Sequence, residues 1–162
     1  MAAKMEQRIS ASREELVETI LRALQSSSAR HYRGTELPVL AERVERLVDT
    51  FIESLHKDPA RFVTYVRALA GERLAEGFPL REVQLALNLL GEAAWKVGAA
   101  GTELKQVVSD LGATTGIIGC AKDQLALIYL EQKEEAQASV VRLQGKLREL
   151  FGGTDAHELP DD

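Results

Sequence analysis

A short corner, Gly77-Phe78-Pro79, constrains the fold of this chain more than any other sequence feature. Apolar residues recur at helical spacing on both sides of it, across residues 69–76 and 80–97. A glycine just after a helix adopts the left-handed backbone that ends it, and a proline fits the start of the next helix. The pattern therefore predicts two packed helices joined at a tight corner, with Trp95 as a core anchor in the second.

Helical spacing also governs the other segments of the chain. Asp58-Pro59 is a helix start, because the carboxylate can cap the first turn and the proline suits its first position. Ser12 and Glu15 predict a capping box at the start of another helix. No strand-like alternation persists anywhere. We therefore expect an all-α chain, a single-domain bundle of about five to six helices with a long C-terminal helix.

Composition and the positions of helix-breaking residues predict four segments within the 162 residues. Residues 1–11 are expected to form a flexible lead-in, or the first turns of a helix. Residues 12–135 are expected to form a helical sensor or regulatory bundle, and residues 136–151 a heptad helix that carries the signal. Residues 152–162 are polar and acidic, which predicts a disordered tail.

The C-terminal helix carries a heptad pattern. Five apolar residues are spaced four, three, four and three apart: Ala136, Val140, Leu143, Leu147 and Leu150. This spacing is typical of a coiled-coil seam, although it covers only about two heptads. It predicts a homodimer through this helix. Upstream, the glycines at positions 112, 116 and 119 predict a smooth helix face on which another backbone could lie close.

Charge and hydropathy disfavour several classes of partner. The net charge is −5, and basic and acidic residues are interspersed, so no concentrated basic patch for nucleic acid is expected. No apolar run reaches the roughly 18 residues that a membrane span requires, and the N-terminus has no apolar signal core. We therefore expect a cytoplasmic protein that binds neither nucleic acid nor membrane.

Residues with catalytic potential are sparse. The single cysteine, Cys120, lies in an apolar run, which predicts a buried structural thiol. The three histidines have no metal-binding spacing, and no phosphate loop or paired-carboxylate motif is recognisable. We therefore predict no enzyme activity, no metal and no cofactor. Two alternatives stay open: a ligand-free protein-interaction adaptor, and a globin-like heme or small-molecule sensor with His31 as the heme ligand.

The corner and its flanking helices resemble a known family. The segment YVRALAGERLAEG, followed by FPLREVQLALNLLGEAAW, resembles the N-terminal sensor domain of RsbT co-antagonist proteins of the RsbRD type. The same order of elements is similar to the N-terminal part of PucR-like regulators. Tyr129, in LALIYLEQKEEA, resembles the tyrosine near the start of the family's exit helix, and HYRG fits upstream. The resemblance covers most of residues 12–135.

The resemblance implies an all-α, commonly dimeric module whose C-terminal helix leads to an output domain. It implies a non-catalytic bacterial signalling domain of the kind found in stressosome and histidine kinase proteins. The expected partners are a second copy of the chain and a sigma-factor regulator, kinase or phosphatase. No output domain follows here, so we expect a stand-alone sensor or a piece of a larger protein. The signal is expected to travel as a shift in helix packing at the corner or the glycine face.

Overall fold

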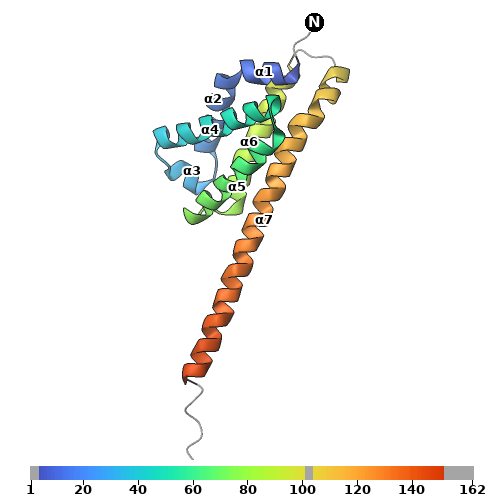
Figure 1. Cartoon of the computed structure of the whole chain (residues 1–162). Coiled ribbons are helices and arrows are strands. Elements are labelled where there is room, and N and C mark those ends of the chain that lie inside the picture. The colour runs from blue at the N-terminus through green and yellow to red at the C-terminus, as the bar shows by residue number, and fades with distance from the viewer. Residues whose placement is uncertain (1–3, 101–103, 152–162) are drawn as a thin grey trace, which may run out of the picture. The chain divides into compact units, whose positions relative to one another are not determined.

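The computed structural model describes residues 4–100 and 104–151, with the side chains of the second range described from residue 112 onward except residue 113 (Figure 1). Seven helices and no strand occur in these ranges. They are α1 (Met5–Ala11), α2 (Arg13–Ser26), α3 (Arg30–Gly34), α4 (Leu37–His56), α5 (Pro59–Ala75), α6 (Leu80–Ala99) and α7 (Leu104–Phe151). The predicted all-α fold with a long C-terminal helix is confirmed, with more helices than expected.

The chain divides into two units, Met1–Ile128 and Tyr129–Asp162. In the first unit, α2 packs between α4 and α6, α4 packs on α5, and α1 contacts both α4 and α6 (Figure 1). In the second unit, every described side chain after Tyr129 is exposed. The predicted acidic tail, residues 152–162, lies outside the described residues.

The core of the first unit is built from the apolar stripes of its helices. Phe51 of α4 and Phe62 of α5 are fully buried and meet edge to face, with ring centroids 5.4 Å apart. Leu87 and Leu90 of α6 and Leu125 of α7 are also fully buried. Burial of this apolar surface is the main source of stability for such a bundle.

Of the two alternatives predicted for the N-terminus, residues 5–11 take the helical one, and the flexible lead-in is wrong for them. These residues form α1, and Met5 and Ile9 are buried in the first unit, 1% and 0% exposed. Met5 also explains Gly98 of α6. A Cβ atom on Gly98 would lie 2.6 Å from Cγ and Cε of Met5, so a larger residue there would require the buried Met5 side chain to move. The sequence pattern did not identify α1 with certainty, because a helix of seven residues contains little more than one apolar repeat.

One helix start follows the sequence prediction and another does not. Asp58 caps α5, since its carboxylate accepts a hydrogen bond from the Ala60 N–H at 3.0 Å. Ser12 precedes α2 but makes no side-chain cap, so the capping box is wrong. Its N–H donates to the Arg8 carbonyl at 3.0 Å and its carbonyl accepts from the Leu16 N–H at 3.0 Å. The chain thus passes from α1 to α2 with its backbone already paired.

The predictions for the middle of α7 are also corrected. Ile117, Ile118, Ala121 and Leu125 form its buried stripe, and Cys120 lies off this stripe and is exposed. The three glycines of the expected smooth face lie roughly opposite the stripe, at positions 112, 116 and 119. A Cβ atom added to any of them would meet nothing within 4 Å. No described backbone lies close to this face.

Candidate functional site

The corner between α5 and α6 is closed by its own backbone. Gly77 has φ 82°, the left-handed value expected of a glycine after a helix. Its N–H donates to the Leu74 carbonyl at 2.9 Å, and the Phe78 N–H donates to the Arg73 carbonyl at 2.8 Å. This pair of bonds is a Schellman motif, which satisfies the last carbonyls of α5. Pro79 then occupies the N-cap of α6, where its ring restricts the backbone φ angle.

The ring of Phe78 contacts both α3 and α5 at this corner. Phe78 is 5% exposed, and its ring centroid lies 4.7 Å from that of His31 and 5.1 Å from that of Tyr32, both on α3. The guanidinium carbon of Arg73, near the end of α5, lies 5.6 Å from the same centroid. A cation over an aromatic face is attracted by the ring quadrupole. The corner residue therefore fixes the position of the Arg73 side chain.

Glu82, in the first turn of α6, is a buried carboxylate that the sequence analysis missed. Its two oxygens accept hydrogen bonds from the Arg30 and His31 backbone N–H groups, each at 3.1 Å, at the start of α3. The His31 Nδ1 lies 3.1 Å from Glu82 Oε2. The carboxylate thus caps a helix that is distant in sequence. The His31 ring is engaged by Glu82 and Phe78, which gives no support to its proposed role as a heme ligand.

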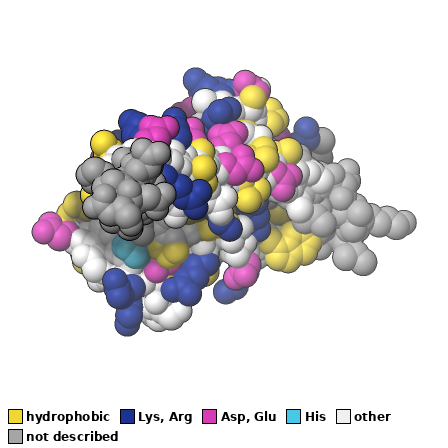
Figure 2. Space-filling view, turned by 90° about the horizontal axis from the view of Figure 1, so that it is seen from below, with side chains coloured by type: hydrophobic (Ala, Val, Ile, Leu, Met, Phe, Trp, Pro, Cys, Tyr) yellow, Lys and Arg dark blue, Asp and Glu magenta, His cyan; other side chains and the backbone are white. Residues whose placement is uncertain are grey.

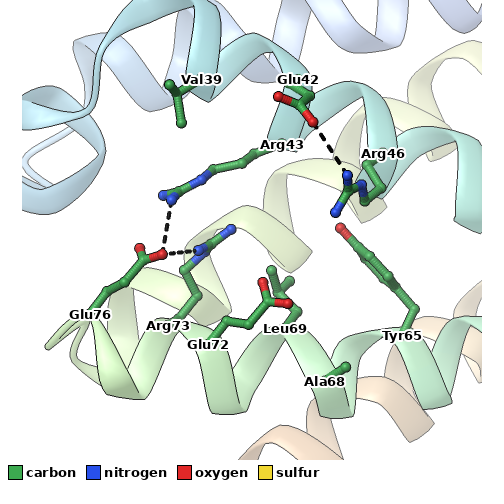
Figure 3. Close-up of a pocket in the computed structure, with 10 residues that line it drawn as sticks. All are labelled: Val39, Glu42, Arg43, Arg46, Tyr65, Ala68, Leu69, Glu72, Arg73 and Glu76. Carbon is green, nitrogen blue, oxygen red and sulfur yellow. Dashed lines mark hydrogen bonds and ion pairs between the residues drawn. The ribbon is translucent and has the colours of Figure 1, made fainter.

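A groove of about 390 Å³ lies between α4 and α5 (Figure 3). A single oxygen, Oε1 of Glu76, accepts from Arg43 Nη2 of α4 and from Arg73 Nη1 of α5, both at 2.9 Å. The Arg73 side chain is only 5% exposed, whereas that of Arg43 is 26% exposed. Two guanidinium groups therefore share one carboxylate at the end of α5, directly before the corner.

Polar groups also line the other end of this groove. Arg46 pairs with Glu42 at 3.3 Å, and both side chains are well exposed. The hydroxyl end of Tyr65 points toward Arg46 (Figure 3). Burial raises the pKa of Tyr65, and the nearby charges of Arg46 and Arg73 oppose that rise. The phenol is therefore a neutral hydrogen-bonding group at physiological pH.

A second groove, of about 350 Å³, lies between α6 and the first part of α7. Trp95 lines it and is 41% exposed, so its predicted role as a core anchor is wrong. The physical reason is its position on the helix: Ala94 belongs to the buried stripe of α6, and the next residue lies on a different face. On the same side, a Cβ on Gly91 would lie 3.4 Å from Ile118 Cδ1, which is close to an ordinary van der Waals contact.

The five residues of the predicted dimer seam all lie on α7 in the second unit and are exposed. Leu143 is 60% exposed, Leu147 53% and Leu150 74%. We call Ala136, Val140, Leu143, Leu147 and Leu150 the heptad seam. Isolated exposed apolar residues are ordinary, but a continuous row of them marks an interaction surface.

The described charged side chains on one face of the chain do not form a surface patch that would indicate a binding partner. Figure 2 shows Lys and Arg mixed with Asp and Glu over the described part of one face, with hydrophobic side chains between them. Phosphate binding by charge alone needs a concentrated basic patch. This face therefore gives no support to a nucleic-acid partner.

Comparison with protein families decides the class of this domain. The profile of the RsbT co-antagonist protein rsbRD N-terminal domain matches residues 14–148. The chain belongs to this family. Comparisons with curated proteins and with solved structures find no match. As an RsbRD N-terminal domain, the chain is a signalling-related regulatory domain, as the resemblance of its corner segment implied.

The family match also bears on the heptad seam. It runs from α2 through residue 148, and so includes all of the seam except Leu150. Among the described residues of this RsbRD N-terminal domain, no cluster of side chains suited to a metal ion occurs. None of the described helices combines the length and apolar character needed to cross a membrane. The groove between α4 and α5, the groove beside Trp95 and the heptad seam are candidate functional features.

Proposed function

We propose that this RsbRD N-terminal domain is a non-catalytic, cytoplasmic regulatory module that pairs with a second copy of itself through the heptad seam. The observation that carries this proposal is the exposure of the whole seam in a helix that the family match covers. Fully burying one leucine side chain contributes about 1.5–3 kcal/mol. An exposed seam lacks this stabilising free energy, and packing against a partner helix would supply it.

The residues beside the seam favour a second copy as that partner. In a coiled coil, the positions that flank the seam choose the partner by charge. Here Gln137, Ser139 and Gln144 occupy such positions and are uncharged, and Lys146 is the one charged residue at a flanking position between Ala136 and Leu150. Two identical helices can therefore approach with little like-charge repulsion.

The same helix offers a route for the signal. α7 is one helix from Leu104 to Phe151, and it contains both the buried stripe around Ile118 and the heptad seam. A ligand or partner that moves the stripe within the first unit would change how two seams pair. Relay of a signal requires such a helix with two alternative packing states. The proposed downstream partner is a sigma-factor regulator, kinase or phosphatase, in keeping with the family resemblance.

The seam is tested by a charge placed on it. Leu143→Lys puts an ammonium group where two helices would meet, and Ala138→Lys places the same group on the opposite side of the helix. Both positions are exposed in the single chain, so neither change disturbs the first unit. Sedimentation equilibrium should show a dimer for the unchanged chain and for Ala138→Lys, and a monomer for Leu143→Lys.

Two results would contradict the proposed function. One is a monomer for the unchanged chain over the whole accessible concentration range. The other is an undiminished dimer for Leu143→Lys, which would place the contact elsewhere. A chain that ends after Gln132 lacks the entire seam and should behave like Leu143→Lys.

A further inference from the structure

We propose that the groove between α4 and α5 binds a small organic carboxylate, which Arg73 and Arg43 hold beside Glu76. The proposal concerns binding alone and does not depend on pairing through the heptad seam. It starts from Arg73, whose side chain is largely buried although it makes one hydrogen bond among the described residues.

Arg73 has more donors than the protein uses. Its side chain is 5% exposed, yet among the described residues it makes one hydrogen bond, from Nη1 to Glu76 Oε1. A guanidinium carries five N–H donors in a planar fork. In Figure 3 the other end of the Arg73 fork points into the groove, away from Glu76. The Arg73 guanidinium carbon lies over the Phe78 ring, 5.6 Å from its centroid, and this contact restricts the position of the fork.

Within the cluster of Arg43, Arg73 and Glu76, two guanidinium groups share one carboxylate, so these three side chains carry one positive charge in excess. Arg43 and Arg73 both donate to the same oxygen of Glu76, and no other carboxylate pairs with either of them among the described residues. One further carboxylate would neutralise the pair. It would also accept the free donors in the forked geometry that arginine and carboxylate prefer.

The rest of the groove favours a singly charged organic acid over phosphate. Three arginines and three glutamates line the groove, so its formal charges cancel. Glu72 lines it without an ion pair to any described residue and would repel a second negative charge on the ligand. Val39 and Leu69 supply apolar surface for a short carbon chain. The volume of about 390 Å³ lies at the lower end of the range for small-molecule sites.

Propionate is the probe for this site, and inorganic phosphate is the comparison. Titration of the full chain, followed by ¹H–¹⁵N NMR, should give saturable shifts of the Arg73 Nε–H and Gly77 amide signals with propionate. Arg73→Met should weaken propionate binding by at least about tenfold, because a charge-assisted hydrogen bond is lost. Arg67→Met removes an exposed arginine of the same helix that does not line the groove, and it should leave binding unchanged.

Further variants keep the test decisive if Arg73→Met fails to fold. Arg43→Met changes a partly exposed side chain and should also weaken propionate binding by about tenfold. Glu76→Gln removes the carboxylate that competes for both guanidinium groups and should tighten binding. The proposal is overturned by the absence of saturable shifts, by tighter binding of phosphate, or by unchanged binding in both arginine variants. Repeating the titration on Leu143→Lys separates binding from pairing.

Discussion

The two parts of α7 carry similar residues in different surroundings. Between residues 114 and 128, Ile117, Ile118 and Leu125 are buried within the first unit. Between residues 130 and 151, every side chain is exposed, although Leu143 and Leu147 follow the same helical spacing. Periodicity therefore shows that a helix has an apolar face, and it does not show what covers that face. In the first part, the other helices of the first unit bury the apolar face. In the second part, we propose that a second copy of the chain buries it.

The largest effect should come from a leucine on the covered part. Leu125→Ala removes a fully buried side chain and should lower the free energy of unfolding of the first unit by about 2–5 kcal/mol. Leu127→Ala changes a side chain that is 49% exposed and should cost less than about 1 kcal/mol. Urea denaturation at one protein concentration measures both. Equal costs would mean that the two faces of this part of α7 are equally covered.

Glycines sharpen the same contrast between covered and open helix faces. Gly98→Ala should lower the free energy of unfolding by about 1–3 kcal/mol, because the added Cβ meets the buried Met5 side chain at 2.6 Å. Gly116→Ala should raise it by up to about 1 kcal/mol, since nothing lies within 4 Å and alanine favours the helix. Thermal unfolding compares the two variants. A shift of the same sign in both would contradict this description of their surroundings.

The smallest effect concerns the exposed part. Lys133 precedes Val140 by one heptad, so it occupies the same seam as the apolar residues, and its charge should weaken pairing. Lys133→Leu should therefore tighten self-association by about tenfold. Ala138→Leu adds the same side chain on the opposite side of the helix and should leave the association constant unchanged. Sedimentation equilibrium distinguishes them, and weaker pairing of Lys133→Leu would argue against the heptad seam.

Local signals predicted much of the fold. The cap at Asp58 and the left-handed backbone at Gly77 are encoded within a few residues, and the structure places both as expected. The family resemblance of the corner segment is confirmed by a match over residues 14–148. In contrast, Trp95 was misplaced because a large aromatic residue suggests a core, while its exposure depends on one step around the helix from Ala94.

The polar clusters could not be predicted, because their members are distant in sequence. Glu82 and His31 are 51 residues apart, and Arg43 and Glu76 are 33 apart. Glu82, Arg43 and Glu76 each have the pattern of an exposed charge on a helix. Only the packing of α4 on α5, and of α3 near the start of α6, brings the partners together. Neither helical periodicity nor a short sequence motif indicates a contact between residues so far apart in sequence.

The contact of α1 with α4 and α6 has a practical consequence for producing this domain. A family match that begins at residue 14 invites a shortened protein that starts there. Such a chain would lack Met5 and Ile9 and would open the surface against which both side chains are buried. Exposed apolar surface of this kind favours aggregation. Expression from the first residue is therefore expected to give the more soluble preparation, and the seven residues of α1 belong to the folded unit.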